Sequence, residues 1–440
     1  MIASPEFRRN LWLEFSPYRL LAMPVILGAI FLLATLGGRR ALDEITGSVS
    51  AFLFIVLVFL WGTRLAAETV IGEVLGRTWD QQRLSAIGAW PLAWGKLFGA
   101  PSYAWYGGLI CMVIYAVSQA THWGPGTVLS AVALYITTGL LAHALALALS
   151  LQAVQRRRAF GRVQVLWCQV VAVIPAAVLL YSGLGGLADN GDYAMTTWFG
   201  IAVTETHFML GAAAAFAAWA LAGVHALVRL ELMYRHGPWL WLGFVIFAMA
   251  FFGGLEFSGW NIPEILTALP GGPSVAFIIA ATAAYAMAFG EPKNRVGFRR
   301  LAHYGRAGQW RRVFELVPRS ALTLLLAGGA AFTAGALVDP AQIRLSIAAT
   351  FLFVIRDIGF IFVLNLKNDT SAGSADARAF LFLVLAYTLG PALAQTLGAS
   401  PLSAFFWPQW GEPALMTIAA PLIEVCVVGY LLVRRLRKIS

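Results

Sequence analysis

Long apolar runs recur along the whole chain and are separated by shorter polar segments. Each run is about 20 residues long, which is the length of α-helix that crosses the roughly 30 Å hydrocarbon core of a membrane. Twelve runs can be counted, at residues 20–37, 47–66, 97–118, 128–152, 163–183, 208–229, 238–254, 274–290, 320–338, 344–366, 379–397 and 413–433. This pattern predicts an all-α, polytopic membrane bundle with about twelve transmembrane helices.

The composition indicates the same class of protein. Hydrophobic residues make up 60% of the chain and charged residues only 12%, and the mean hydropathy is +0.75. Soluble globular domains are about one-quarter charged, so this composition excludes them. Because Cys111, Cys168 and Cys426 all fall within predicted spans, we expect neither a disulfide nor a metal or cofactor in this chain.

The basic residues predict the orientation of the chain in the membrane. With the N-terminus in the cytoplasm, 27 of the 31 Lys and Arg residues fall in cytoplasmic segments. Basic residues are retained on the cytoplasmic side during insertion, so we expect both termini there, in a multi-pass protein of the cell inner membrane. Topology and attraction to anionic membrane lipids account for the net charge of +10. We therefore expect no nucleic-acid partner.

An amphipathic segment precedes the first run. Phe7, Leu11, Phe15 and Tyr18 recur at helical spacing, and Arg8 and Arg9 are available to face phosphate headgroups. This spacing predicts an interfacial helix that lies on the membrane surface. We expect Pro17 to mark the bend into the first span, because proline is tolerated in the first turn of a helix.

The segment between the second and third runs is the longest charged interruption in the apolar first half. Arg64 and Glu68 are four residues apart, as are Glu73 and Arg77, whereas Asp80 and Arg83 are three apart. All three pairs can meet on a helix surface, so the segment is expected to be helical and to emerge into water. Gly95 and Lys96 then place a small hinge and a snorkelling cation where the third span enters the membrane.

This segment resembles the coupling segment of ABC-2 type permeases, the membrane subunits of one class of ATP-binding-cassette transporters. In that family an acidic residue, a Gly-Thr-aromatic turn and leucines precede a Gly-Lys entry into the third span. The matching residues of this chain are Glu73, Gly76-Arg77-Thr78-Trp79, Leu84 and Gly95-Lys96.

The resemblance implies a coupling helix near residues 66–90 that seats in a groove of a separate ATPase subunit. It implies a permease half at residues 1–236, with the interfacial helix, six spans and short re-entrant helices in the outer stretch 184–205. Gly95 and Lys96 would form the hinge. The residues that would dock the ATPase are Glu73, Arg77, Thr78, Trp79, Asp80, Arg83 and Leu84.

The resemblance implies that the chain is the permease subunit of an ATP-binding-cassette transporter, and we expect an exporter. A phosphate-binding Gly-Lys motif must be followed by Ser or Thr, but Leu97 follows Gly95-Lys96. The chain is therefore not expected to be an enzyme. ATP and Mg would be held by the partner ATPase.

The second half, residues 237–440, departs from a six-span permease subunit. Its loop at 367–378 is short, small and polar, and lacks an aromatic residue. Either this loop contacts a second ATPase subunit or two copies of the chain assemble as a homodimer. The half also contains a basic cytoplasmic loop at 291–319, which suits the membrane surface or the acidic face of a partner. A weak echo of the N-terminal segment predicts a diverged repeat from about residue 305.

Three ionisable residues fall inside predicted spans of the second half. They are Arg356 and Asp357 in one span and Glu424 in another. Charged groups in hydrocarbon are costly unless they are paired or hydrated. Because adjacent helical residues point about 100° apart, we expect Arg356 and Asp357 to pair with other helices rather than with each other. The set forms either a substrate or proton site or an interhelical polar clamp.

Two other functions remain open from the sequence. An ion-coupled carrier of the major facilitator type also has twelve spans and cytoplasmic termini, but its long inner loop follows the sixth span, whereas here the long loop follows the eighth. A membrane-embedded lipid-modifying enzyme would need His, Asp or Glu residues converging at one depth, and the sequence displays no such set.

Overall fold

The structure is a computed structural model. It describes residues 4–37, 42–85, 87–155, 161–187, 194–234, 237–256, 271–291, 293, 295–338, 341–366, 372–408 and 414–437. The chain divides into two compact units, each with its own packing. Unit 1 comprises Met1–Thr197 with Ile201–His236, and unit 2 comprises Trp198–Gly200 with Gly237–Ser440.

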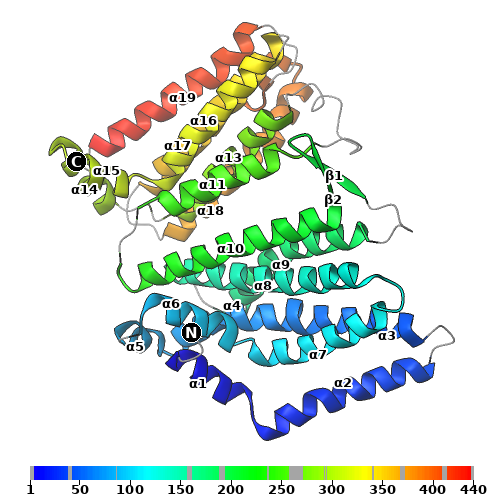
Figure 1. Ribbon diagram of the computed structural model, residues 1–440. Helices are drawn as coiled ribbons and strands as arrows, with labels where there is room; N and C mark the ends of the chain where they lie inside the picture. The colour runs from blue at the N-terminus through cyan, green and yellow to red at the C-terminus, as the bar shows by residue number, and fades with distance from the viewer. Residues whose placement is uncertain are drawn as a thin grey trace. The chain divides into compact units, whose positions relative to one another are not determined.

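Unit 1 is a bundle of long helices with several short helices at one end (Figure 1). Its elements are α1 (Pro5–Glu14), α2 (Pro17–Gly37), α3 (Leu42–Phe54), the π-helix η1 (Ile55–Gly62), α4 (Thr63–Leu75), α5 (Trp79–Leu84), α6 (Ala89–Trp94), the π-helix η2 (Gly95–Gly99), α7 (Ser102–Gln119), α8 (Pro125–Gln155), α9 (Arg162–Gly185) and α10 (Glu205–Glu231). The core is formed largely by α8, which packs against α4, α9 and α10.

The second span is one continuous helix, Ile45–Leu75, that changes from α to π geometry over η1. Side chains of neighbouring helices bind the carbonyl groups of this segment. Nε2 of His143 lies 2.9 Å from the Val58 oxygen, and the Gln169 amide donates to the Leu60 oxygen at 2.8 Å. The indole N–H of Trp105 donates to Nδ1 of His143, so Nε2 carries the proton and donates to Val58. These contacts hold the π segment from α8 and α9.

Unit 2 is also helical. Its described elements are α11 (Trp239–Gly253), α13 (Gly271–Gly290), α14 (Arg295–Arg306), α15 (Trp310–Leu316), α16 (Arg319–Leu337), α17 (Ala341–Asn365), α18 (Ala372–Thr396), the 3₁₀ helix η3 (Ser400–Phe405) and α19 (Ala414–Arg437). One apolar cluster joins α11, α13, α16 and α17, and a second joins α13, α17 and α18.

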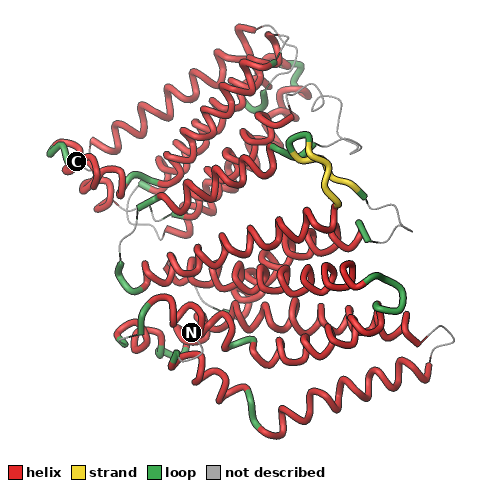
Figure 2. Tube along the Cα trace, in the orientation of Figure 1, coloured by secondary structure: helices red, strands yellow, loops and turns green. Residues whose placement is uncertain are grey.

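The all-α fold predicted from the apolar runs is confirmed, because helices dominate the described chain (Figure 2). Within the described residues, ten helices are long and apolar enough to span a membrane. The third predicted run forms a further helix pair, Ala89–Gly99 with Ser102–Gln119, bent by 55°. The seventh run is the shorter helix α11, with 15 residues. The count of twelve spans stays a prediction.

Two local predictions are wrong. Instead of re-entrant helices, the described part of 184–205 contains the two-stranded sheet β1 (Met195–Trp198) and β2 (Ile201–Thr204). Threonine and β-branched residues at these positions favour strands. The proposed loop 367–378 is helical from Ala372 onward, as the start of α18, and its residues 367–371 lie outside the described part.

The basic loop 291–319 forms helices α14 and α15. At this end of unit 2, Nζ of Lys293 lies 2.9 Å from Oδ1 of Asp376, which also accepts from the Asn365 amide. Pro318 caps α16 just as the chain leaves α15. This order of short helix, proline and span matches α1, Pro17 and α2, but the proposed repeat stays a prediction.

Candidate functional site

The predicted coupling segment is helical in two pieces, α4 and α5, joined by a tight turn. The N–H of Thr78 donates to the Glu73 oxygen and that of Arg77 to the Val74 oxygen, which is the Schellman pattern of a helix C-terminus. Arg77 occupies the left-handed position at φ 56°, where glycine is usual. The turn ends α4 and reverses the chain, so that α5 begins at Trp79.

Two of the three predicted ion pairs are confirmed. Arg64 and Glu68 lie 3.8 Å apart on α4, and Arg83 and Asp80 lie 3.2 Å apart on α5. The predicted pair of Glu73 with Arg77 is wrong, because the left-handed turn takes Arg77 out of the helix. Glu73 pairs instead with Arg9 of α1, at 2.7 Å, and with Lys96 of η2.

One face of α5 is fixed to the end of α10. The buried Trp79 donates its indole N–H to Oε2 of Glu231 at 3.2 Å. Arg83 donates from Nε to the Glu231 carbonyl at 2.9 Å and lies 3.6 Å from its carboxylate. Trp79 and Arg83 therefore bind within the chain itself, and they orient α5 relative to the bundle.

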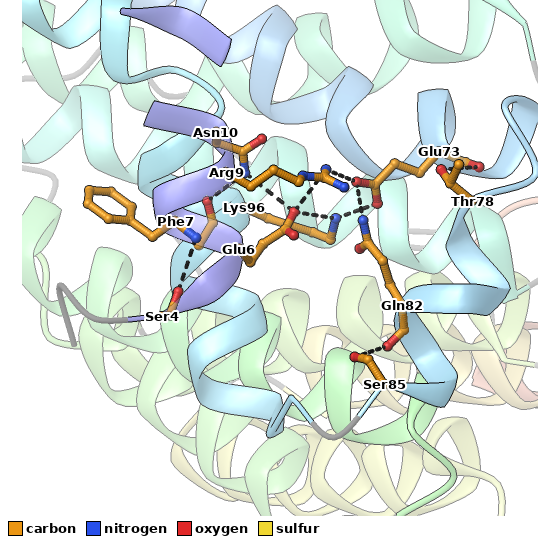
Figure 3. A network of polar contacts seen from close by, with 11 residues as sticks. Ser4, Glu6, Phe7, Arg9, Asn10, Glu73, Thr78, Gln82, Ser85 and Lys96 are labelled. Atoms are coloured by element: carbon orange, nitrogen blue, oxygen red, sulfur yellow. Dashed lines mark hydrogen bonds and ion pairs between the residues drawn. The ribbon is translucent and has the colours of Figure 1, made fainter. Parts of the chain in front are cut away.

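Lys96 lies at the centre of this region and is fully buried, so it does not snorkel as predicted (Figure 3). Its ammonium group contacts the carboxylates of Glu73 and Glu6, the latter at 3.4 Å. It also lies 5.2 Å from the ring centre of Trp79. A buried ammonium group is stable only when it is paired, and Lys96 is paired by carboxylates from two separate helices.

Helix α1 packs directly onto η2, and the hinge glycine explains how. A Cβ on Gly95 would lie 2.8 Å from the Glu6 side chain, and one on Gly99 would lie 2.8 Å from Asn10. The absence of side chains there lets α1 approach, and the Asn10 amide donates to the Gly95 oxygen at 3.3 Å. The predicted hinge is thus clamped by α1.

The predicted amphipathic face of α1 is corrected in part. Its polar residues Glu6 and Asn10 are buried against the bundle, whereas Trp12 is 81% exposed. Arg9 contacts Glu6 and Glu73 rather than facing headgroups alone. An exposed tryptophan still suits the membrane interface. The spacing of Glu6 and Asn10, four residues apart and so on one helix face, was the feature of the sequence that could have indicated a polar stripe facing inward.

We call this network the α5 cluster. It joins α1, α4, α5, η2 and α10, and its members are Glu6, Arg9, Asn10, Glu73, Trp79, Gln82, Arg83, Lys96 and Glu231. Sequence reasoning missed Glu6, Asn10, Gln82 and Glu231. Glu231 had no local signal, because it lies far along the chain from α5.

The opposite face of α5 is exposed. The side chain of Asp80 is 83% exposed and Leu84 is 88% exposed. Arg77 and Thr78, in the turn, are exposed as well, as is Leu75 at the end of α4. The segment therefore presents two leucines, an acidic residue and the turn outward, while Trp79 and Arg83 face inward.

The intramembrane residues of unit 2 form a second cluster. Nε of Arg356 lies 2.7 Å from Oδ1 of Asp357, and its Nη1 lies 2.6 Å from Oε2 of Glu424. The expected pairing with other helices is confirmed by the contact of Arg356 with Glu424, but the expectation that Arg356 and Asp357 do not pair with each other is wrong. With Tyr285 and Tyr387, which both bind Asp357, these residues make up what we call the Arg356 cluster.

Neither a metal site nor a similarity to known proteins identifies the function of this chain. Within the described part of the chain, no group of three or more His, Cys, Asp or Glu residues is placed to hold a metal ion. No protein-family model matches the sequence, and no curated protein or solved structure matches it.

Proposed function

We propose that this chain is the membrane permease subunit of an ATP-binding-cassette transporter, acting as an exporter with a separate ATPase subunit. One observation carries the proposal: a short helix between the second and third spans is held rigidly on its inner face and exposed on its outer face. A helix that transmits force from a partner needs both properties, because movement of a loosely held helix would not reach the bundle.

The α5 cluster supplies the connection to the spans. A push on α5 acts on α4 through the turn at Arg77, and on η2 through the contacts of Lys96 with Glu73 and Trp79. The same push acts on α10 through Glu231. The second, third and sixth predicted spans would therefore tilt together. Both spans that flank α5 contain a π-helical segment, a geometry often found at functional sites within helices.

The exposed residues of α5 define the docking surface of the proposal. Leu84 would insert into an apolar groove of the ATPase, and Asp80 would contact a basic residue at its rim. Burying one leucine side chain contributes about 1.5–3 kcal/mol, so we expect Leu84→Asp to weaken association by roughly tenfold or more.

Site-specific crosslinking tests the proposal. A photoreactive residue at position 84 is expected to form an adduct, in native membranes, with a protein that contains an ATP-binding cassette. The matched control places the same residue at Met195, which is also exposed but lies in the hairpin β1–β2. Leu84→Asp is expected to reduce co-purification of that ATPase, and Met195→Asp to leave it unchanged. An ATPase that co-purifies equally with both variants, or an adduct with no ATPase in it, would contradict the proposal.

A further inference from the structure

The Arg356 cluster lies well inside the spans of unit 2. Arg356 and Asp357 belong to the span Ile343–Asn365, and Glu424 belongs to the span Thr417–Arg437. Asp357 is fully buried, and Arg356 is nearly so. The cluster also receives Tyr285 from α13, Tyr387 from α18 and the carbonyl of Phe405 from η3.

The hydrogen-bond donors around Asp357 stabilise its ionised, negatively charged form. Its Oδ1 accepts from Nε of Arg356. Its Oδ2 accepts from the hydroxyls of Tyr285, at 2.6 Å, and Tyr387, at 2.7 Å. Three donors, one of them a guanidinium group, stabilise a carboxylate even in a low-dielectric interior. Asp357 and Arg356 are thus a satisfied pair.

Once Arg356 and Asp357 are paired, Glu424 is the member of the cluster whose negative charge has no cation of its own. Its Oε2 accepts from Nη1 of Arg356 at 2.6 Å, and Arg356 also donates to Phe405 and Tyr387. The guanidinium group is therefore shared between two carboxylates. Among the described residues, the other groups that contact the cluster, two tyrosine hydroxyls and one backbone carbonyl, are neutral. An ionised Glu424 would leave one uncompensated negative charge inside the hydrocarbon, which is strongly unfavourable.

We propose that Glu424 is an intramembrane proton-binding site. A proton from water adds to Oε1, forming an O–H bond, while Oε2 continues to accept from Arg356. With the proton bound, the cluster is neutral. When the proton leaves to water, the cluster carries one negative charge and the attraction between Arg356 and Glu424 strengthens. Arg356 belongs to α17 and Glu424 to α19, so proton binding weakens one contact between these two helices.

The inference does not rest on the transporter role, because it is argued from the contacts of the Arg356 cluster alone. The side chain of Glu424 is 25% exposed, whereas that of Asp357 is fully buried. The packing of the described residues therefore leaves part of the Glu424 carboxyl uncovered, so a proton can be exchanged there. Asp357 has no uncovered part, and it serves instead to position Arg356.

Infrared spectroscopy on the full-length protein in zwitterionic lipid vesicles tests the inference. At about pH 7 water-exposed carboxyl groups are ionised, so a carbonyl stretch of a protonated carboxylic acid reports a buried one. We expect this band in the wild type, with an isotope shift in D₂O. We expect it to be absent in Glu424→Gln and retained in Glu291→Gln, which removes the partly buried carboxyl of Glu291 just after α13.

Each outcome of the infrared experiment either supports or overturns the proposed protonation of Glu424. A wild type without the band, or a band that Glu424→Gln leaves unchanged, would overturn the inference. A change in the Glu424 carboxylate bands on adding Na⁺ or an alkylammonium ion, with no protonated band, would overturn it too and would indicate a bound cation. If Glu424→Gln fails to fold, Glu424→Asp replaces it: a shifted band supports the inference, and an unshifted band refutes it.

Discussion

Lys96 is the residue on which the α5 cluster depends most, because it is the one member that contacts carboxylates from both α1 and α4 without any solvent exposure. Removing one partner from a buried ion pair leaves the other charge uncompensated and costs about 3–5 kcal/mol. Replacing both partners by neutral groups of similar shape costs far less. The two kinds of substitution can therefore separate the energy of pairing from that of packing.

We expect Lys96→Met to lower the free energy of unfolding by about 3 kcal/mol, measured by denaturation of the detergent-solubilised protein. Methionine keeps the length of the side chain, so the loss reports the charge. Adding Glu6→Gln to Lys96→Met is expected to restore part of the stability, because Arg9 then has to balance only the carboxylate of Glu73. A single variant as stable as the wild type would show that Lys96 is not paired in the folded protein.

The sequence predicts single residues well where the chemistry is local. The pairs Arg64 with Glu68 and Asp80 with Arg83 follow directly from helical spacing. It fails where a turn intervenes, as at Arg77, whose positive φ removes it from the helix. It also fails for Glu231, because no pattern in one sequence relates the end of α10 to a short helix near residue 80.

At the scale of elements, helix termini are joined by side chains from other segments. Glu291, just after α13, accepts hydrogen bonds from the N–H of Arg319, at 2.7 Å, and from the Ser320 hydroxyl, at the first turn of α16. A carboxylate at a helix N-terminus is favoured by the helix dipole. Burial nevertheless raises the pKa of Glu291, and its hydrogen bonds to Ser320 and Arg319 only partly offset this effect.

This raised pKa predicts a stability that depends on pH. Between the ordinary pKa of 4.5 and its raised value, the folded protein binds more protons at Glu291 than the unfolded chain does. Stability therefore falls as the pH rises through that window. In a pH series of thermal denaturation, we expect the wild type to lose stability relative to Glu291→Gln as the pH increases from about 4.5.

The control for this series is Glu315→Gln, which removes a more exposed carboxylate of α15. Its pH profile is expected to follow that of the wild type. If the difference between the wild type and Glu291→Gln grows in favour of the wild type with rising pH, hydrogen bonding outweighs burial at this site and the predicted sign is wrong.

Elements were predictable from the apolar runs, because the described part of each run lies mostly in helix, although the third run is broken into a bent pair. The local geometry within these elements was not predictable, since it depends on residues distant in sequence. The π segments are one example: η1 is held by His143 and Gln169 of other helices. The strands β1 and β2 are another, because four-residue strands carry too little pattern to be distinguished from polar loop.

At the scale of the whole molecule, helix α11 decides the number of membrane crossings. Helix α11 has 15 residues, about 22 Å of helix, which is shorter than the roughly 30 Å hydrocarbon core. If α11 crosses, the basic helices α14 and α15 lie in the cytoplasm on the same side as α5. If it does not, every later loop changes side and the basic residues of 291–319 face outward, against the retention of basic residues in the cytoplasm.

Labelling of single cysteines by a membrane-impermeant maleimide on intact cells distinguishes the two cases. With Cys111, Cys168 and Cys426 replaced by serine, a cysteine is placed at one exposed position per variant: Leu84 in α5, Met195 in β1, Trp310 in α15 or Leu402 in η3. Twelve crossings predict labelling at 195 and 402 only. Labelling at 310 but not at 84 or 402 would mean that α11 lies within one leaflet, whereas labelling at 84 would place α5 outside and remove any role for it in contacting a cytoplasmic ATPase.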